Sequence, residues 1–225
     1  MKMRKESSFD WKASPVVPPF KPELLNKMVL VKYEDLVKRY KIENYDIEEL
    51  DRRMRKDLQD TIVCMPFGDR RIYYNKKSRK VMDWGLHLGT DYFLKAGNPI
   101  FSIMESKVII AGNYFSSELE NDWGNIIILK AKNGLNIFYA HLDFAPNIVK
   151  QGNRIIQKGE LIGHVAKGYT KANGNWPEHL HLQISKIDMT HGYANDESAF
   201  KDYINPEDIF PIGGGVPKKT LEELL

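Results

Sequence analysis

Cysteine is nearly absent from the chain, since Cys64 is the only one among 225 residues. An intrachain disulfide is therefore excluded, and we expect Cys64, which lies in an apolar run at residues 61–65, to pack in a core. The sequence also lacks any run of about 20 apolar residues, so no membrane-spanning helix is expected. A basic stripe with interleaved aromatic residues is missing as well, which argues against a nucleic-acid-binding module.

Charge is unevenly distributed along the chain. Residues 1–80 carry 20 basic and 13 acidic side chains, whereas residues 81–225 carry 13 and 17. The basic half could dock on an acidic surface. A local basic cluster is interpreted first as a solvated hairpin and second as a contact for an anionic substrate or partner. Its members are Arg70, Arg71, Lys76, Lys77, Arg79 and Lys80.

The N-terminal third divides into an arm and a helical extension. The proline-rich end of residues 1–22 can be neither helix nor central strand, so it predicts an extended arm that lies across another surface. Within residues 23–60, helices are predicted at 34–40 and 47–58. The second has an apolar stripe at helical spacing, formed by Ile47, Leu50, Met54 and Leu58, and Asp46 is its expected N-cap. We expect these helices to pack on a β domain and to wall one end of its groove.

The segment Glu178-His179-Leu180-His181-Leu182-Gln183-Ile184 is the most informative part of the chain. Read as a strand, it places the apolar residues on one face and His179, His181 and Gln183 on the other, solvent-facing one. Two imidazoles on a rigid strand suit a metal site or acid–base chemistry. A polar strand face that happens to carry two histidines is the alternative interpretation.

Two further segments contribute histidines. His87 and Asp91 are four residues apart, and an extended chain would separate their Cα atoms by roughly 13 Å. A shared ion therefore requires a bend, which we expect Gly89 to permit through its backbone freedom.

Residues 126–129 and 137–142 flank Asn133-Gly134, a strong hairpin signal. The hairpin is expected to present His141 on the face opposite Phe138, Ala140 and Leu142.

The ordered set His-x-x-x-Asp, Tyr-Ala-His-Leu and His-Leu-His resembles the LytM/lysostaphin-type zinc endopeptidases. The resemblance covers about residues 81–187 within a domain that we place at 61–210. It implies a mainly β fold built from antiparallel strands, with a duplicated motif that is faintly visible as Gly97-Asn98-x-Ile100 and Gly152-Asn153-x-Ile155. Asn205-Pro206 begins a short closing element, and 211–225 is expected to be a tail with a linker and a final helical turn.

The resemblance also implies the roles of the site residues. His87, Asp91 and His181 become zinc ligands, and His141 and His179 become the catalytic pair. Spacing alone leaves these roles open, since histidines at i and i+2 on a strand can both bind one metal. Three further residues are candidates for the substrate groove: Tyr92, Asn175 and Trp176. Asp143 and Glu178 are interpreted as turn residues or imidazole partners, and His164 and His191 as surface or capping histidines.

The implied function is zinc-dependent hydrolysis of a peptide bond, most readily in peptidoglycan cross-bridges or stem peptides. A non-catalytic binding or regulatory module and a phosphocarrier are the alternatives. The Trp-Pro-x-His-Leu-His-x-Gln variant is similar to a divergent branch that also occurs fused to cytosolic enzymes, so a cytosolic hydrolase acting on another amide is a further alternative.

No apolar segment of the kind found in signal peptides follows the basic first residues. We therefore expect a cytoplasmic location, with non-standard export or release to the periplasm or cell wall as the alternative. The sequence makes no prediction of oligomeric state.

Overall fold

The structure, a computed structural model, describes residues 16–58, 60–114, 122–146, 148, 154–188 and 192–212. Several predictions fall outside these ranges: the first part of the arm, His191, the Gly152-Asn153 copy of the repeat, and the linker and helical turn of the tail. No helix in the described ranges is long and apolar enough to cross a bilayer.

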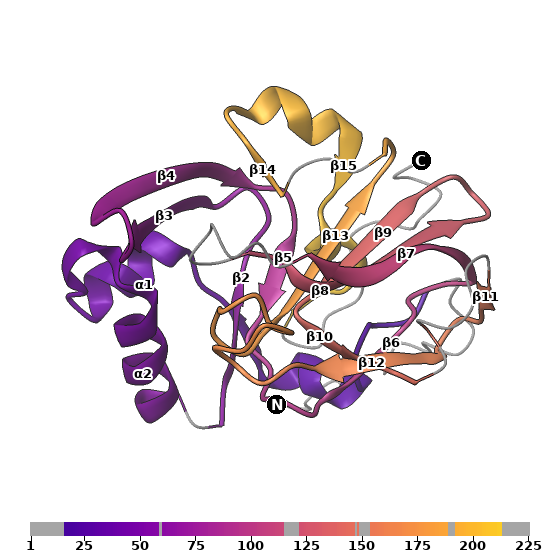
Figure 1. The fold of residues 1–225 in the computed structure, drawn as a ribbon, viewed down its shortest axis with the longest axis horizontal. Helices are drawn as coiled ribbons and strands as arrows, with labels where there is room; N and C mark the ends of the chain where they lie inside the picture. Colours follow the sequence, from indigo (N-terminus) through magenta and orange to yellow (C-terminus); the bar gives the residue numbers. More distant parts are fainter. Residues whose placement is uncertain are drawn as a thin grey trace, which may run out of the picture.

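A sheet of nine strands forms the centre of the described structure, in the order β1-β2-β5-β13-β9-β8-β7-β11, with β15 also paired to β13 (Figure 1). These strands are β1 Met28–Leu30, β2 Ile62–Met65, β5 Thr90–Tyr92, β7 Ser106–Tyr114, β8 Gly124–Ala131, β9 Asn136–Ala140, β11 Ile155–Ile156, β13 Leu180–Ser185 and β15 Tyr203–Ile204. The pairs are antiparallel except β1 with β2. The prediction of a mainly β, antiparallel fold is confirmed.

Two sheets of three strands complete the β structure. One has the order β10-β12-β6 and the other β14-β4-β3. Their strands are β10 Leu142–Phe144, β12 Leu161–Val165, β6 Pro99–Phe101, β14 Tyr193–Ala194, β4 Lys80–His87 and β3 Arg70–Asn75. The β3–β4 hairpin contains the basic cluster and extends from the main sheet toward the N-terminal helices (Figure 1).

The main core lies against one face of β13 and β9. Leu180, Leu182 and Ile184 are fully buried there beside Ile137 and Tyr139, as the alternation of β13 predicts. The opposite face of β13 is not solvent-facing, because His181 and Gln183 are each only 1% exposed. That part of the prediction is wrong: aromatic rings from other elements cover the histidine face.

The hairpin predicted at Asn133-Gly134 joins β8 to β9. Gly134 has φ +91°, its N–H donates to Ala131 O at 3.0 Å, and the Asn133 side chain accepts from Leu135 N. Glycine accommodates this left-handed backbone without steric cost. The turn fixes the register that pairs β9 with β13.

The described end of the arm lies on the β domain itself. Val17 N donates to Ile103 O at 2.9 Å, and Phe101 N donates to Pro19 O at 2.7 Å. Val16 and Phe20 are buried in the main core. Residues 16–20 of the arm therefore belong to the same packed unit as the sheet.

Short helices and one strand make up the N-terminal extension: η1 Pro22–Lys27, β1, α1 Tyr33–Arg39, η2 Glu43–Tyr45 and α2 Ile47–Asp57. The extension is not wholly helical, since β1 lies in the main sheet beside β2. Asp46 caps α2 as predicted, accepting hydrogen bonds from Glu48 N and Glu49 N. The apolar stripe of α2 packs in a second core that includes Tyr73 and Trp176.

The chain closes with η3 Glu197–Asp202, β15 and α3 Pro206–Ile209. The Asn205 side chain caps α3 by accepting from Glu207 N at 2.9 Å, and Pro206 stands at its first position. Glu207 then bonds both Thr90 Oγ1 and Phe67 N. The predicted closing element thus anchors the segment that enters β5.

Candidate active site

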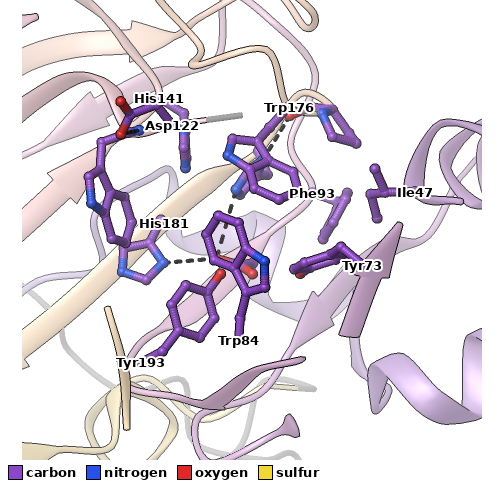
Figure 2. Close-up of a pocket in the computed structure, with 13 residues that line it drawn as sticks. Ile47, Tyr73, Trp84, Phe93, Asp122, His141, Trp176, His181 and Tyr193 are labelled. Atoms are coloured by element: carbon purple, nitrogen blue, oxygen red, sulfur yellow. Dashed lines mark hydrogen bonds and ion pairs between the residues drawn. The ribbon is translucent and has the colours of Figure 1, made fainter. Parts of the chain in front are cut away.

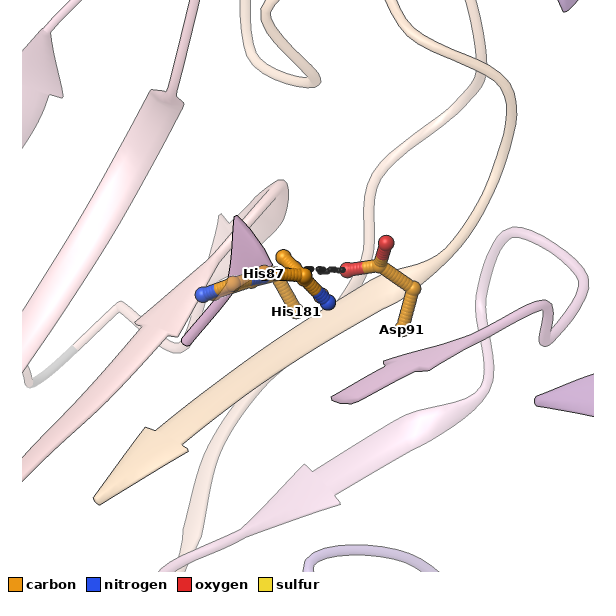
Figure 3. Close-up of side chains that lie close together, drawn as sticks. All are labelled: His87, Asp91 and His181. Atoms are coloured by element: carbon orange, nitrogen blue, oxygen red, sulfur yellow. Dashed lines mark hydrogen bonds and ion pairs between the residues drawn. The ribbon is translucent and has the colours of Figure 1, made fainter. Parts of the chain in front are cut away.

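His87, Asp91 and His181 converge from three strands, β4, β5 and β13 (Figure 3). His87 Nε2 lies 3.0 Å from His181 Nδ1, His181 Nδ1 lies 3.0 Å from Asp91 Oδ1, and His87 Nε2 lies 3.4 Å from Asp91 Oδ1. Three donors bound at zinc distances in a tetrahedral arrangement would be about 3.4 Å apart. The donor set therefore fits a divalent metal ion.

The local chain geometry explains this convergence. β4 ends at His87, the chain turns through Leu88 and Gly89, and β5 then pairs Asp91 directly with His181. The predicted bend is present, but its reason differs from the expected one, because Gly89 does not adopt a left-handed φ. A Cβ at Gly89 would lie 2.6 Å from Leu182 O and 2.7 Å from His181 Cε1. Close packing against β13 is what requires glycine.

Burial controls the protonation of this cluster. Burial lowers the pKa of His87 to about 4, so its imidazole is neutral at physiological pH. Burial alone would raise the pKa of Asp91, but the neighbouring His87 and His181 outweigh it and hold that pKa well below its usual range. Neutral imidazoles and an ionised carboxylate are the forms that bind metals.

His141 and His179 lie beside the cluster, with ring centroids 4.2 Å apart. His141 Nδ1 donates to Asn173 O and His179 Nδ1 donates to Pro177 O, each at 2.7 Å. A proton on Nδ1 leaves the Nε2 lone pair available in both neutral rings. Burial lowers the pKa of each ring, and in His141 the neighbouring His179 and His181 lower it further.

His141 reaches the site through an unusual backbone conformation. Its φ is +66°, which few non-glycine residues adopt and which breaks the strand alternation between β9 and β10. The prediction that His141 lies on the face opposite Phe138 and Ala140 is wrong, because both residues lie on the side of the site. The ring of Phe138 packs edge-on against His181, with ring centroids 5.6 Å apart. Leu142 lies in the main core.

Arg71 is the residue that sequence reasoning missed. The basic cluster predicts a solvated hairpin, but the Arg71 side chain is 0% exposed. Its Nη2 donates to His87 Nδ1 at 3.0 Å and to Asp91 Oδ2 at 3.2 Å, and its Nη1 pairs with Asp69 Oδ2. The strand period of β3 was an available signal, because it places Arg71 on the same face as the buried Tyr73.

A hollow opens over the histidines and is lined largely by aromatic rings (Figure 2). The lining comprises Ile47, Tyr73, Trp84, Asp91, Phe93, Asp122, Trp123, His141, Trp176, Pro177, His179, His181 and Tyr193. α2, the β3–β4 hairpin and β14 supply one side of it, so the N-terminal extension does wall part of the site.

Only one of the three groove candidates lines this hollow. Trp176 does, in ring contact with Tyr73 and Trp84. Tyr92 is fully buried in the main core, with its ring against Phe20, because it points to the side of β5 opposite Asp91. Asn175 lines a separate surface depression beside α2. Phe93, Trp123 and Tyr193 are further wall residues, which no motif in the sequence indicates.

The remaining polar candidates take structural positions. The Glu178 carboxylate accepts from Ala96 N at 3.1 Å and pairs with Arg55 of α2, so it ties the segment before His179 to its surroundings. Asp143 is exposed on β10, and His164 is partly exposed on β12. Cys64 is buried in the main core, as expected.

Comparison with known proteins agrees with these motifs. The chain is 32% identical over 120 residues to the glycyl-glycine endopeptidase ALE-1 of Staphylococcus capitis. The aligned region covers 52% of this chain and 29% of the relative. It is 29% identical over 105 residues to the DD-carboxypeptidase/endopeptidase Mpg of Neisseria meningitidis, and this region covers 47% of this chain and 21% of the relative. The match therefore spans less than a third of either curated relative.

Solved structures with some likeness include the solution structure of lysostaphin, with TM-score 0.43 and 20% identity over 68% of this chain and 54% of that chain. The structure of LytU gives a TM-score of 0.40 and 24% identity, over 61% of this chain and 94% of that chain. The sequence profile of peptidase family M23 matches residues 85–197, just over half of the 225 residues. That range contains all five histidine and aspartate site residues, and the predicted resemblance is confirmed: the chain belongs to peptidase family M23.

Proposed function

We propose that this protein is a zinc-dependent endopeptidase that hydrolyses a peptide bond in peptidoglycan cross-bridges or stem peptides. The observation that carries the proposal is the juxtaposition of two groups of side chains. Three ligand atoms converge on one point, and two imidazoles with available Nε2 atoms lie beside them over one hollow.

His87 Nε2, Asp91 Oδ1 and His181 Nδ1 would hold the ion. The surroundings of His181 support this assignment. With an ion on Nδ1, the ring would carry its proton on Nε2, and Gln183 Oε1 lies 3.3 Å from Nε2 as an acceptor for it. Two neutral imidazoles and one carboxylate form the open three-ligand set of catalytic zinc sites. A bound zinc ion supplies Lewis acidity, which polarises the substrate carbonyl and lowers the pKa of a water molecule.

His141 and His179 would carry out the proton transfers. With Nδ1 of each ring held by a backbone carbonyl, Nε2 can accept a proton from the attacking water and return it to the leaving amine. The same nitrogens, once protonated, can donate to the oxyanion that develops on the scissile carbonyl. The stacking of His179 on Phe93, with centroids 5.3 Å apart, fixes the ring plane for this role.

The substrate assignment is supported by the relatives, which are named as a glycyl-glycine endopeptidase and a DD-carboxypeptidase/endopeptidase. The aromatic walls of the hollow offer large, rigid contact surfaces to a short peptide. Peptide links of small residues would bring the scissile carbonyl close to the buried histidines.

The test is incubation of the zinc-loaded protein with purified sacculi and with oligoglycine peptides, followed by mass spectrometry of the products. New amine and carboxyl ends at one peptide linkage are expected, and Asp91→Asn, which removes the carboxylate at nearly equal volume, should release none. Cleavage of neither material by protein with a full complement of zinc would overturn the substrate assignment. It would favour another amide substrate or a binding role.

A further inference from the structure

Arg71 places a buried positive charge against two of the proposed metal ligands. The guanidinium is completely buried, and Asp69, its partner on the other side, is 6% exposed. Asp69 Oδ2 also accepts from Tyr33 N at 2.7 Å, so the N-terminal extension helps to hold the pair. Arg71 does not line the hollow, and any effect it has must pass through Asp91 and His87.

The two ligand imidazoles differ in the group that faces their far nitrogen, which is the ring nitrogen pointing away from the proposed ion. In His181 this nitrogen faces the Gln183 carbonyl oxygen, which accepts its proton. In His87 the far nitrogen, Nδ1, faces Arg71 Nη2, which can only donate. If His87 Nε2 binds a metal, neutral His87 carries its proton on Nδ1, and two donors then face each other. An acceptor at this position strengthens a histidine ligand, and a donor does the opposite.

Arg71 also acts on Asp91. Its bond to Oδ2 directs Oδ1 alone toward the histidines, which favours binding through one oxygen. The same bond draws charge away from the carboxylate, and the guanidinium adds a cation close to the ion. A further sign of strain at this position is Arg71 Nε, which is buried without a hydrogen-bond partner among the described residues.

We propose that Arg71 is a positioning residue that lowers the metal affinity of the site while fixing Asp91 as a one-oxygen ligand. Asp69 moderates the effect by neutralising most of the guanidinium charge. The proposal rests on the metal ligands of the proposed function and adds a regulatory property to them. Activity should then depend on the free zinc concentration around the protein.

The experiment measures the zinc dissociation constant by competition with a chelating dye, with no substrate present. The double variant Asp69→Asn/Arg71→Met removes the donor and both charges at similar volume, and it should bind zinc about 10-fold more tightly or better. Asp69→Asn alone removes the negative partner on the side away from the ligands, so the guanidinium charge acts more strongly on Asp91 and His87 and should weaken zinc binding. The amide oxygen of the introduced asparagine can still accept from Tyr33 N.

Arg70 and Asp83 supply the matched control. They form an exposed ion pair on the same hairpin, next to Arg71 in sequence but away from the ligands. Asp83→Asn/Arg70→Met should leave the zinc dissociation constant unchanged. Thermal unfolding of each variant separates metal affinity from folding, because a purely structural role for Arg71 would lower the melting temperature and the affinity together.

The outcomes distinguish the two proposals. Weaker or unchanged zinc binding by Asp69→Asn/Arg71→Met, with a zinc-binding wild type, overturns the role of Arg71 alone. Absence of zinc binding by the wild type, the control and both variants would instead overturn the zinc enzyme itself.

Discussion

The two groups of site residues are held in opposite ways. The rings and carboxylate of His87, Asp91 and His181 face one another, and Arg71 also contacts His87 and Asp91. His141 and His179 are instead tied to backbone carbonyls through Nδ1, and the Nε2 atom of His179 lies 3.8 Å from Asp91 Oδ1, beyond hydrogen-bond distance. Converging donor atoms suit an ion, whereas separately anchored imidazoles suit proton transfer. The proposed roles therefore differ for His179, which lies just before β13, and His181, which lies in that strand.

The largest effect should follow from removing a ligand. We expect Asp91→Ala and His181→Ala to lose tightly bound zinc and all measurable hydrolysis, because a two-ligand remnant cannot hold the ion at trace concentrations. Elemental analysis of the purified variants measures the metal, and circular dichroism confirms folding. Full zinc occupancy in either folded variant would contradict the ligand assignment.

The second effect should separate chemistry from metal binding. His141→Ala and His179→Ala should keep zinc near the wild-type level and lose about 10²–10⁴-fold in kcat/KM, as expected for general acid–base and oxyanion groups. Zinc content and kinetics are measured on the same preparations. Loss of the ion in either variant would contradict the separation of ligands from proton-transfer residues, since that histidine would then be a ligand.

The third effect concerns pH. Burial lowers the pKa values of His141 and His179 below the ordinary 6.5, so both rings stay neutral at pH 6.5 and accept protons less well only as the pH falls through the lowered values. The acid limb of kcat/KM should therefore have its midpoint below pH 6.5. Zinc content, determined at each pH, controls for loss of the ion. A midpoint above 6.5 would show that these rings are not the titrating bases.

The smallest effect should come from the contact between α2 and the segment before His179. Arg55 Nη2 donates to Glu178 O at 3.2 Å, and its Nε bonds Asp51 Oδ1. Arg55→Met should cost about 1 kcal/mol or less in unfolding free energy, since the Arg55 side chain is about a third exposed. It should lower kcat a few-fold by loosening His179, with zinc content unchanged.

Arg52→Met is the control for that variant, because Arg52 lies on the exposed side of α2 and pairs only locally with Glu49. Denaturant unfolding and steady-state kinetics compare the two. Equal kcat values for Arg55→Met and the wild type would show that the contact with Glu178 does not position the catalytic pair.

Local patterns predicted much of this structure. Alternation in β13, the Asn133-Gly134 turn and the Asp46 cap depend on neighbours in the chain, and each is present where expected. The motif resemblance also predicted that His87, Asp91 and His181 meet. Asp91 of β5 pairs directly with His181 of β13, and the short turn after β4 brings His87 from a second sheet to the same place. The resemblance supplied roles that spacing alone left open.

Residues that depend on tertiary context were not predicted. Arg71 belongs to a cluster of hairpin cations that predicts exposure. The strand period indicates its face, but its complete burial depends on the pairing with Asp69 and on the packing of α1 against β3. His141 departs from strand alternation through one φ angle, which no residue pattern shows. The prediction of Tyr92 in the groove is wrong, because Tyr92 follows Asp91 on β5 and adjacent strand residues point to opposite faces.

We propose that one ion is held by His87, Asp91 and His181, while His141 and His179 remain unligated beside it. Anomalous X-ray diffraction at the zinc edge, on crystals of the zinc-loaded protein, locates the ion and its ligands. We expect one anomalous peak within bonding distance of His87 Nε2, His181 Nδ1 and a single Asp91 oxygen. A peak bonded to His141 or His179, or no peak at these three side chains in protein that contains zinc, would contradict the account.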